Sequence, residues 1–70
     1  MTDRRARRRH ALAMARHYAD LANHVERASG RYAVDPDEYV RSQAAVLLER
    51  ASVARATGRR WASVARRLTV

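Results

Sequence analysis

Apolar side chains in the first half of the chain recur in alternating steps of three and four residues. This spacing is typical of one face of an α-helix. Thr2 or Asp3 can cap the start of such a helix, and Gly30 is a residue type that commonly ends one. The pattern therefore predicts a first helix over about residues 4–29. Its predicted core face consists of Ala11, Met14, Tyr18, Leu21, Val25 and Ala28.

A second helix start follows a short break. Asp35 fits the N-cap, Pro36 the first helical position, and Glu38 lies three residues after the cap, as in a capping box. The helix is predicted over about residues 36–57, before Gly58. Its predicted core face consists of Val40, Ala44, Leu47, Leu48, Ala51 and Ala54.

The last part of the chain repeats the helical spacing once more. Trp61, Val64, Ala65 and Leu68 predict a short third helix over about residues 59–68, with Trp61 in the core rather than stacked on a base. One long bent helix through Gly58 is the alternative, because the apolar phase drifts there without reversing. The fold class is all-α: an antiparallel helical hairpin in a single domain over residues 1–70, with residues 1–9 as a basic N-terminal arm.

The predicted core is thin for an independent domain. Of 70 residues, 15 are alanines, which make up nearly half of the hydrophobic 47%, and no cysteine is present to form a disulfide. Alanine buries little apolar area, so we expect the hairpin to dimerise into a bundle or to fold against a partner.

One apolar stripe lies outside the predicted core face. Tyr39, Val46 and Val53 follow one another at seven-residue spacing on a flank of the second helix. A single neighbouring helix cannot cover both this flank and the core face. The stripe is the candidate partner-binding surface.

The charge is strongly basic and concentrated at the chain ends. All 15 basic residues are arginines, against 7 acids, and the formal net charge is +8. Residues 1–10 and 57–70 each carry +4, whereas residues 11–56 are neutral. Antiparallel helices joined by a short linker bring these segments to one tip. The residues expected there are Arg4, Arg5, Arg7, Arg8, Arg9, Arg55, Arg59 and Arg60.

Clustered guanidinium groups favour a phosphate-rich partner, because they stay charged and present paired donors. We therefore expect a non-enzymatic nucleic-acid-binding or regulatory accessory protein. A small adaptor or inhibitor that docks a protein through Tyr39, Val46 and Val53 is the alternative. An unselective, solvated arginine tail and attachment to an anionic membrane surface are the other readings of the charge.

Other chemistry has little basis in the sequence. His10, His17 and His24 are seven residues apart, whereas chelation on one helix needs ligands three or four apart, so we expect no metal. The spacing of Ser, His and acidic residues requires no catalytic pair, and we expect no enzyme, cofactor or small-molecule substrate. The sequence shows no transmembrane run and no signal peptide, so a cytoplasmic location is expected.

Residues 61–70, Trp-Ala-Ser-Val-Ala-Arg-Arg-Leu-Thr-Val, resemble the first helix and turn entry of a helix-turn-helix DNA-binding unit. Ala65 stands where that unit has a small residue at the helix crossing, and Thr69 stands where it usually has glycine. The resemblance covers ten residues and implies DNA as a partner. It carries over no base-reading residue, because the chain ends where the groove-reading helix would begin.

Overall fold

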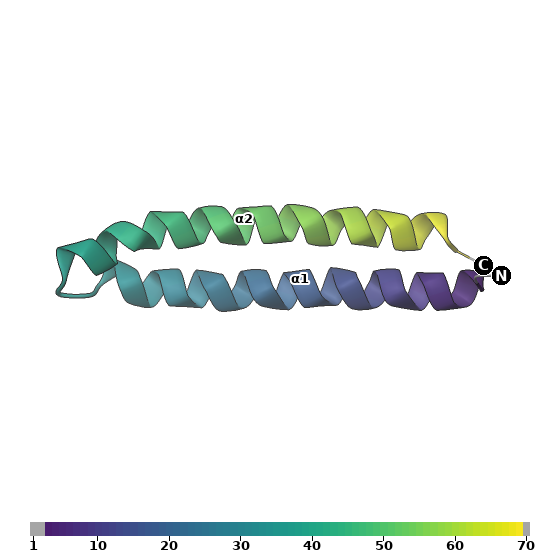
Figure 1. Ribbon diagram of the computed structural model, residues 1–70, viewed down its shortest axis with the longest axis horizontal. Coiled ribbons are helices and arrows are strands. Elements are labelled where there is room, and N and C mark those ends of the chain that lie inside the picture. The colour runs from purple at the N-terminus through teal and green to yellow at the C-terminus, as the bar shows by residue number, and fades with distance from the viewer. Residues whose placement is uncertain (1–2, 70) are drawn as a thin grey trace.

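The computed structural model describes residues 3–69, which form two antiparallel α-helices joined by a short loop (Figure 1). Helix α1 spans Arg4–Ala33 and helix α2 spans Glu38–Arg67, and each has 30 residues. Both chain ends lie at the same end of the hairpin, where Arg4 Nη2 donates a hydrogen bond to the Arg67 carbonyl oxygen at 3.3 Å. The predicted all-α antiparallel hairpin is confirmed.

Helix α2 continues through Gly58, so the separate third helix predicted over about residues 59–68 is wrong. Gly58 is buried against α1, and a Cβ atom there would lie 3.3 Å from both the Ala15 carbonyl oxygen and Tyr18 Cβ. The glycine permits a close approach of the two helices and does not break the chain direction. Residues 59–67 form the last turns of α2.

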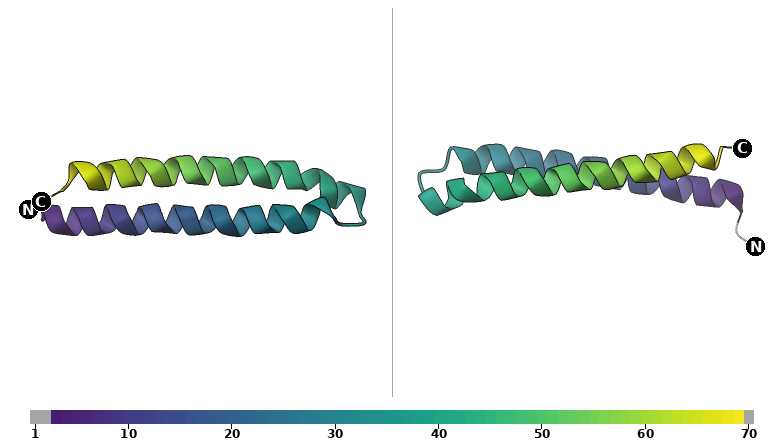
Figure 2. Two further views of the ribbon diagram at one scale, coloured as in Figure 1. Left: turned by 180° about the vertical axis from the view of Figure 1, so that it is seen from behind. Right: turned by 90° about the horizontal axis from the view of Figure 1, so that it is seen from above.

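Small residues form the contact line between the helices. No large side chain among residues 3–69 is completely buried. On α2, positions 44, 51, 58 and 65 are all buried, and this seven-residue repeat is that of a supercoiled pair, seen as the shallow crossing in Figure 2. The buried positions of both helices are Ala11, Ala22, Ser29, Ala44, Ala51, Ala54, Gly58 and Ala65.

The core prediction is wrong at two leucines. Leu21 is 40% exposed and Leu48 is 54% exposed, whereas Ala22 and Ala51 are almost fully buried. The prediction gave weight to large apolar side chains, but only small ones fit where the two backbones approach closely. The larger side chains therefore lie beside the contact line rather than on it.

The connection between the helices also differs from its prediction. Helix α1 passes through Gly30 and ends at Ala33. Gly30 does not have the left-handed conformation of a helix-ending glycine, since no residue between 3 and 69 adopts a positive φ angle. The N-cap of α2 is Asp37 rather than Asp35. Asp37 Oδ1 accepts from the Tyr39 amide at 2.8 Å, while Asp35 Oδ1 accepts from the Asp37 amide at 2.8 Å within the loop.

At the start of α1, Asp3 is the N-cap and its side chain accepts from the Arg5 amide at 3.1 Å. The other cap candidate, Thr2, lies outside the described residues, as does Val70, the last residue of the helix-turn-helix resemblance.

The hairpin is a thin rod with a single helix–helix interface. Its extents are 54 × 16 × 12 Å and its radius of gyration is 16.1 Å, against about 11 Å for a compact domain of this length. Most of each helix surface therefore faces solvent. The exposed large apolar residues are Leu12, Leu21, Tyr32, Val34, Tyr39, Val46, Leu48 and Val53.

Candidate nucleic-acid interface

The first turns of α1 carry five arginines beside the last turns of α2. Arg4–Arg9 are helical, so the N-terminal arm predicted over residues 1–9 is, over this stretch, part of α1. The Arg4 guanidinium reaches the Arg67 carbonyl oxygen, which fixes the start of α1 against the end of α2. The helical winding then distributes the neighbouring arginines around this end of the rod.

Three of these arginines surround one open hollow. Arg5, Arg8 and Arg9 line it together with Thr69, and its volume is about 410 Å³. Arg8 is half-buried, and its Nε atom has no hydrogen-bond partner among the described residues. A buried donor without an acceptor is unfavourable. Three guanidinium groups around one concavity suit an anion such as phosphate.

One part of the surface near the arginines is apolar. Arg7 borders a second hollow of about 370 Å³ that is otherwise lined by Ala6, His10, Trp61, Val64 and Leu68. The His10 and Trp61 rings meet edge to face, with their centroids 5.4 Å apart. Trp61 is half-buried beside this hollow, and its place in the core stays a prediction.

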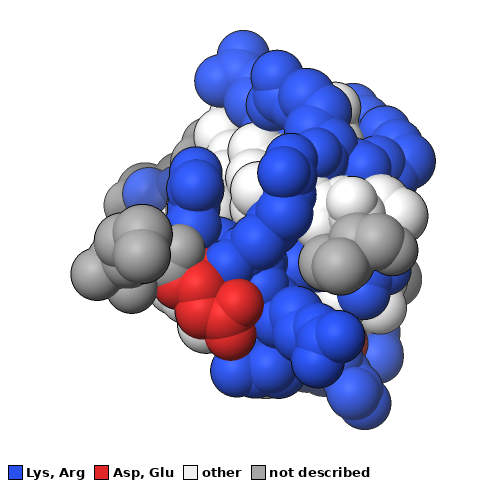
Figure 3. All heavy atoms as spheres, turned by 90° about the vertical axis from the view of Figure 1, so that its right-hand side faces the viewer, with Lys and Arg blue, Asp and Glu red and all other residues white. Residues whose placement is uncertain are grey.

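Charge is distributed unequally between the two halves of the rod. Residues 3–16 and 54–69, which form the half with the chain ends, carry eleven arginines and one acid, Asp3, for a net charge of +10. Residues 17–53, which form the half with the loop, carry four arginines and six acids, for a net charge of −2. Basic side chains cover most of the end surface, with one small acidic patch (Figure 3).

Two arginines at this end were not among the predicted site residues. Arg66 and Arg67 are exposed in the last turn of α2, opposite the start of α1. They were missed because the second helix was predicted to end before Gly58, which placed residues 55–60 at the tip. Continuing the buried seven-residue series through Gly58 to Ala65 would have identified them.

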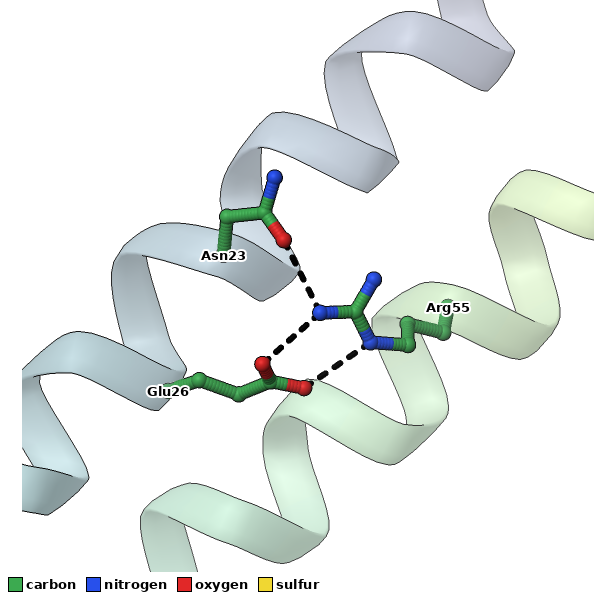
Figure 4. A network of polar contacts seen from close by, with 3 residues as sticks. All are labelled: Asn23, Glu26 and Arg55. Atoms are coloured by element: carbon green, nitrogen blue, oxygen red, sulfur yellow. Dashed lines mark hydrogen bonds and ion pairs between the residues drawn. The ribbon is translucent and has the colours of Figure 1, made fainter.

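The structure places Arg55 near the middle of the rod and away from the predicted arginines of α1. Its Nε donates to Glu26 Oε1 at 2.8 Å, and its Nη2 lies 2.8 Å from Glu26 Oε2 and 2.9 Å from Asn23 Oδ1 (Figure 4). The hydrogen bond to Arg55 lowers the pKa of Glu26 below its ordinary value of 4.5 and raises the pKa of Arg55. Arg55 therefore joins the two helices rather than the arginine cluster.

Arg59 and Arg60 also lie along α2 rather than at its end. Arg59 borders a shallow hollow of about 250 Å³ with Ala15, Ala19 and Gly58, in the same region as Arg55. Arg60 is exposed. We use the name arginine end for the residues that the structure does gather at the paired helix termini: Arg4, Arg5, Arg7, Arg8, Arg9, Arg66 and Arg67.

The predicted partner stripe is exposed on α2. Tyr39 is 72% and Val53 is 64% exposed, and Val46 is also exposed. Val46 and Val53 line a groove of about 290 Å³ with Glu49 and Arg50. These side chains are free to meet another protein surface.

Residues 3–69 contain no group of three His, Asp or Glu side chains close enough to hold a metal ion. Across the same range, neither helix is apolar enough over a sufficient length to cross a bilayer.

Comparison with known proteins adds no assignment. No known protein family matches this chain, and neither a curated protein nor a solved structure shows significant similarity to it.

Proposed function

We propose that this protein binds nucleic acid without catalysing a reaction and that the arginine end holds the phosphate backbone. The observation that carries the proposal is the antiparallel pairing, because it brings five arginines of α1 to the last turn of α2 and leaves a net charge of +10 on one half of the rod. Such a concentration of positive charge attracts a polyanion and is relieved by it. A cytoplasmic location stays part of this proposal.

The hollow between Arg5, Arg8 and Arg9 is the most specific element of the site. A phosphate there would accept from several guanidinium groups at once. Phosphate contacts of this kind are independent of base sequence. We therefore propose backbone binding with no sequence preference.

The test compares two variants with equal loss of charge. Arg5→Gln with Arg9→Gln alters the arginine end, whereas Arg27→Gln with Arg31→Gln removes the same charge from exposed positions at the same spacing of the same helix. Binding to a 20-base-pair duplex, as DNA and as RNA, is measured as a function of salt concentration. The first variant should lower the log–log salt slope by about 1.8 if each guanidinium neutralises one phosphate.

The second variant should keep the slope and most of the affinity, with helicity unchanged in both. An equal loss in the two variants would show that only total charge matters and would contradict a localised site. Unchanged binding in the first variant would contradict nucleic-acid binding by this end.

The exposed stripe favours a second candidate function. Tyr39, Val46 and Val53 lie on a helix face that α1 does not cover, and a groove runs between the two valines. This surface supports an adaptor, an inhibitor or a homodimer, with the arginines steering the encounter. Val46→Ser with Val53→Ser should abolish such a protein contact while leaving the arginine end intact.

A further inference from the structure

Five of the eight exposed large apolar side chains lie on one face of the hairpin. His10 of α1 and Val64 of α2 line the same hollow, so both residues lie on this face of the hairpin. Residues 11 or 18 positions apart point in nearly the same direction, at about 20° and 0° for a helix of 3.6 residues per turn. Leu21 is 11 residues after His10, and Val53 and Val46 are 11 and 18 residues before Val64.

The same winding adds further members to this face. Tyr32 follows Leu21 by 11 residues and Tyr39 precedes Val46 by seven, and both are exposed. Half-buried Met14 and Trp61 lie between the exposed residues and the helix contact line. We call this surface the apolar face. Its exposed members are Leu21, Tyr32, Tyr39, Val46 and Val53.

We propose that a second copy of this chain covers the apolar face in antiparallel orientation, giving a four-helix bundle with an arginine end at each extremity. This dimer specifies the partner of the α2 stripe, for which a protein contact was proposed above. It does not depend on whether the arginine end binds nucleic acid. Three observations specify a second copy as the occupant: the charge distribution, the register of the face and its area.

The charge distribution selects the antiparallel orientation. A parallel pair would place two halves of +10 side by side, which repel each other. An antiparallel pair places the +10 half of one copy beside the −2 half of the other, and it places the two arginine ends at opposite extremities of the dimer. Each half of the rod is thus complementary in charge to the half that it meets.

The apolar residues of α2 lie on both sides of Val53, which is near the middle of the helix. Val46 and Tyr39 lie seven and fourteen residues before Val53, and Arg60 and Arg67 lie at the same distances after it, each followed by an apolar residue, Trp61 or Leu68. A twofold axis at Val53 therefore brings Val46 and Tyr39 of one copy beside Arg60 and Arg67 of the other, next to the apolar hollow that Trp61 and Leu68 line. Such an interface is isologous, as in most homodimers.

The length of the rod allows an interface of ordinary size. One whole side of 54 × 16 Å covers at most about 860 Å² in projection, and a standard specific interface buries about 800 Å² on each partner. The pairing also supplies the second layer that a hairpin with a thin alanine-rich core lacks.

The first experiment places a charge at the proposed twofold axis. Val53→Glu puts two carboxylates next to each other in the dimer, whereas Val34→Glu introduces the same change at a loop position that is 81% exposed. Sedimentation equilibrium should give twice the 8.0 kDa chain mass for the wild type and for Val34→Glu, and the monomer mass for Val53→Glu. A monomeric wild type at tens of micromolar, or a dimeric Val53→Glu variant, would overturn the proposal.

The second experiment measures orientation and does not depend on the folding of a charged variant. The chain has no cysteine, so Val34→Cys provides one site for a spin label at the loop end of each copy. Pulsed electron-spin distance measurement should give a separation of about 50 Å, set by two 30-residue helices rising 1.5 Å per residue in opposite directions. A separation below about 25 Å would show a parallel pair and would overturn the antiparallel arrangement.

Discussion

Gly58 lies where the two helices approach each other closely. Gly30 is also a helical glycine, but no atom of the other helix lies beside it, so it serves as a control position. Both glycines are inside helices, where glycine is less favourable than alanine by about 1 kcal/mol. A Cβ at position 30 would meet nothing within 4 Å, whereas one at position 58 would meet α1 backbone and Tyr18 Cβ at 3.3 Å.

Gly30→Ala should therefore raise the free energy of unfolding by about 0.5–1 kcal/mol, as expected for glycine replacement in a helix. Gly58→Ala should gain less or lose stability, because α1 must move away by a few tenths of an ångström to admit the methyl group. Urea denaturation of both variants measures the difference. Equal stabilisation would show that the small residue at 58 does not set the helix spacing.

The Glu26–Arg55 pair makes part of the hairpin stability depend on pH. The pKa of Glu26 is lowered in the folded protein, so the unfolded chain binds a proton more readily. The stabilisation is therefore complete above the ordinary pKa of 4.5 and is lost as the pH falls through the lower folded value. The difference in unfolding free energy between wild type and Glu26→Gln should shrink below pH 4.5. A difference that stays constant from pH 7 to pH 3 would contradict a contribution from this pair.

The start of α2 depends on an aspartate pair in which the second residue is the cap. Asp37 Oδ1 accepts from the Tyr39 amide and, at 3.4 Å, from the Val40 amide, whereas the Asp35 side chain accepts from the Asp37 amide inside the loop. Asp37→Ala should cost about 1 kcal/mol, as for other N-caps, and Asp35→Ala should cost less. Thermal unfolding of the two variants tests the assignment, and a larger loss for Asp35→Ala would restore the capping box predicted from the sequence.

The helices could be predicted from their apolar spacing, but their ends could not. Gly30 and Gly58 were predicted to end helices because glycine commonly does so, yet both are helical here. In the case of Gly58, the unreversed apolar phase had left one continuous helix as the alternative, and the close contact with α1, about 40 positions away, favours glycine at this position. The choice between Asp35 and Asp37 likewise depended on how the loop around Pro36 folds.

The site could be predicted in outline from the same reasoning. Antiparallel pairing placed the five arginines of residues 4–9 at one tip, and they lie there. The error came from the length of α2, which moved its end from residue 57 to Arg67. Arg55 then fell opposite Glu26 and Asn23, and Arg66 and Arg67 took the place expected for Arg59 and Arg60. A misplaced helix end thus shifted the predicted partners by about three turns.

At the scale of the whole molecule, the proposed dimer and the proposed arginine ends together predict a dependence on nucleic-acid length. With the twofold axis at Val53, Arg67 lies fourteen residues from the axis in each copy, so the two arginine ends are about 42 Å apart. Duplex DNA rises about 3.4 Å per base pair, so about 12 base pairs span this separation. A duplex of about 8 base pairs can contact only one arginine end, whereas one of about 20 base pairs can contact both.

The affinity of the wild type should therefore be higher for the longer duplex than for the shorter one. The increase should exceed the factor expected from the larger number of binding positions on the longer duplex, because the second arginine end binds intramolecularly. The salt slope should rise as well, since more phosphates are neutralised. Each length is also tested with Val53→Glu, because a duplex offers this variant the same number of binding positions although the variant is expected to be monomeric. Val34→Glu is the control with the same change of charge. A length dependence that is the same for the wild type and Val53→Glu would mean that the two ends act separately, even if the dimer itself forms.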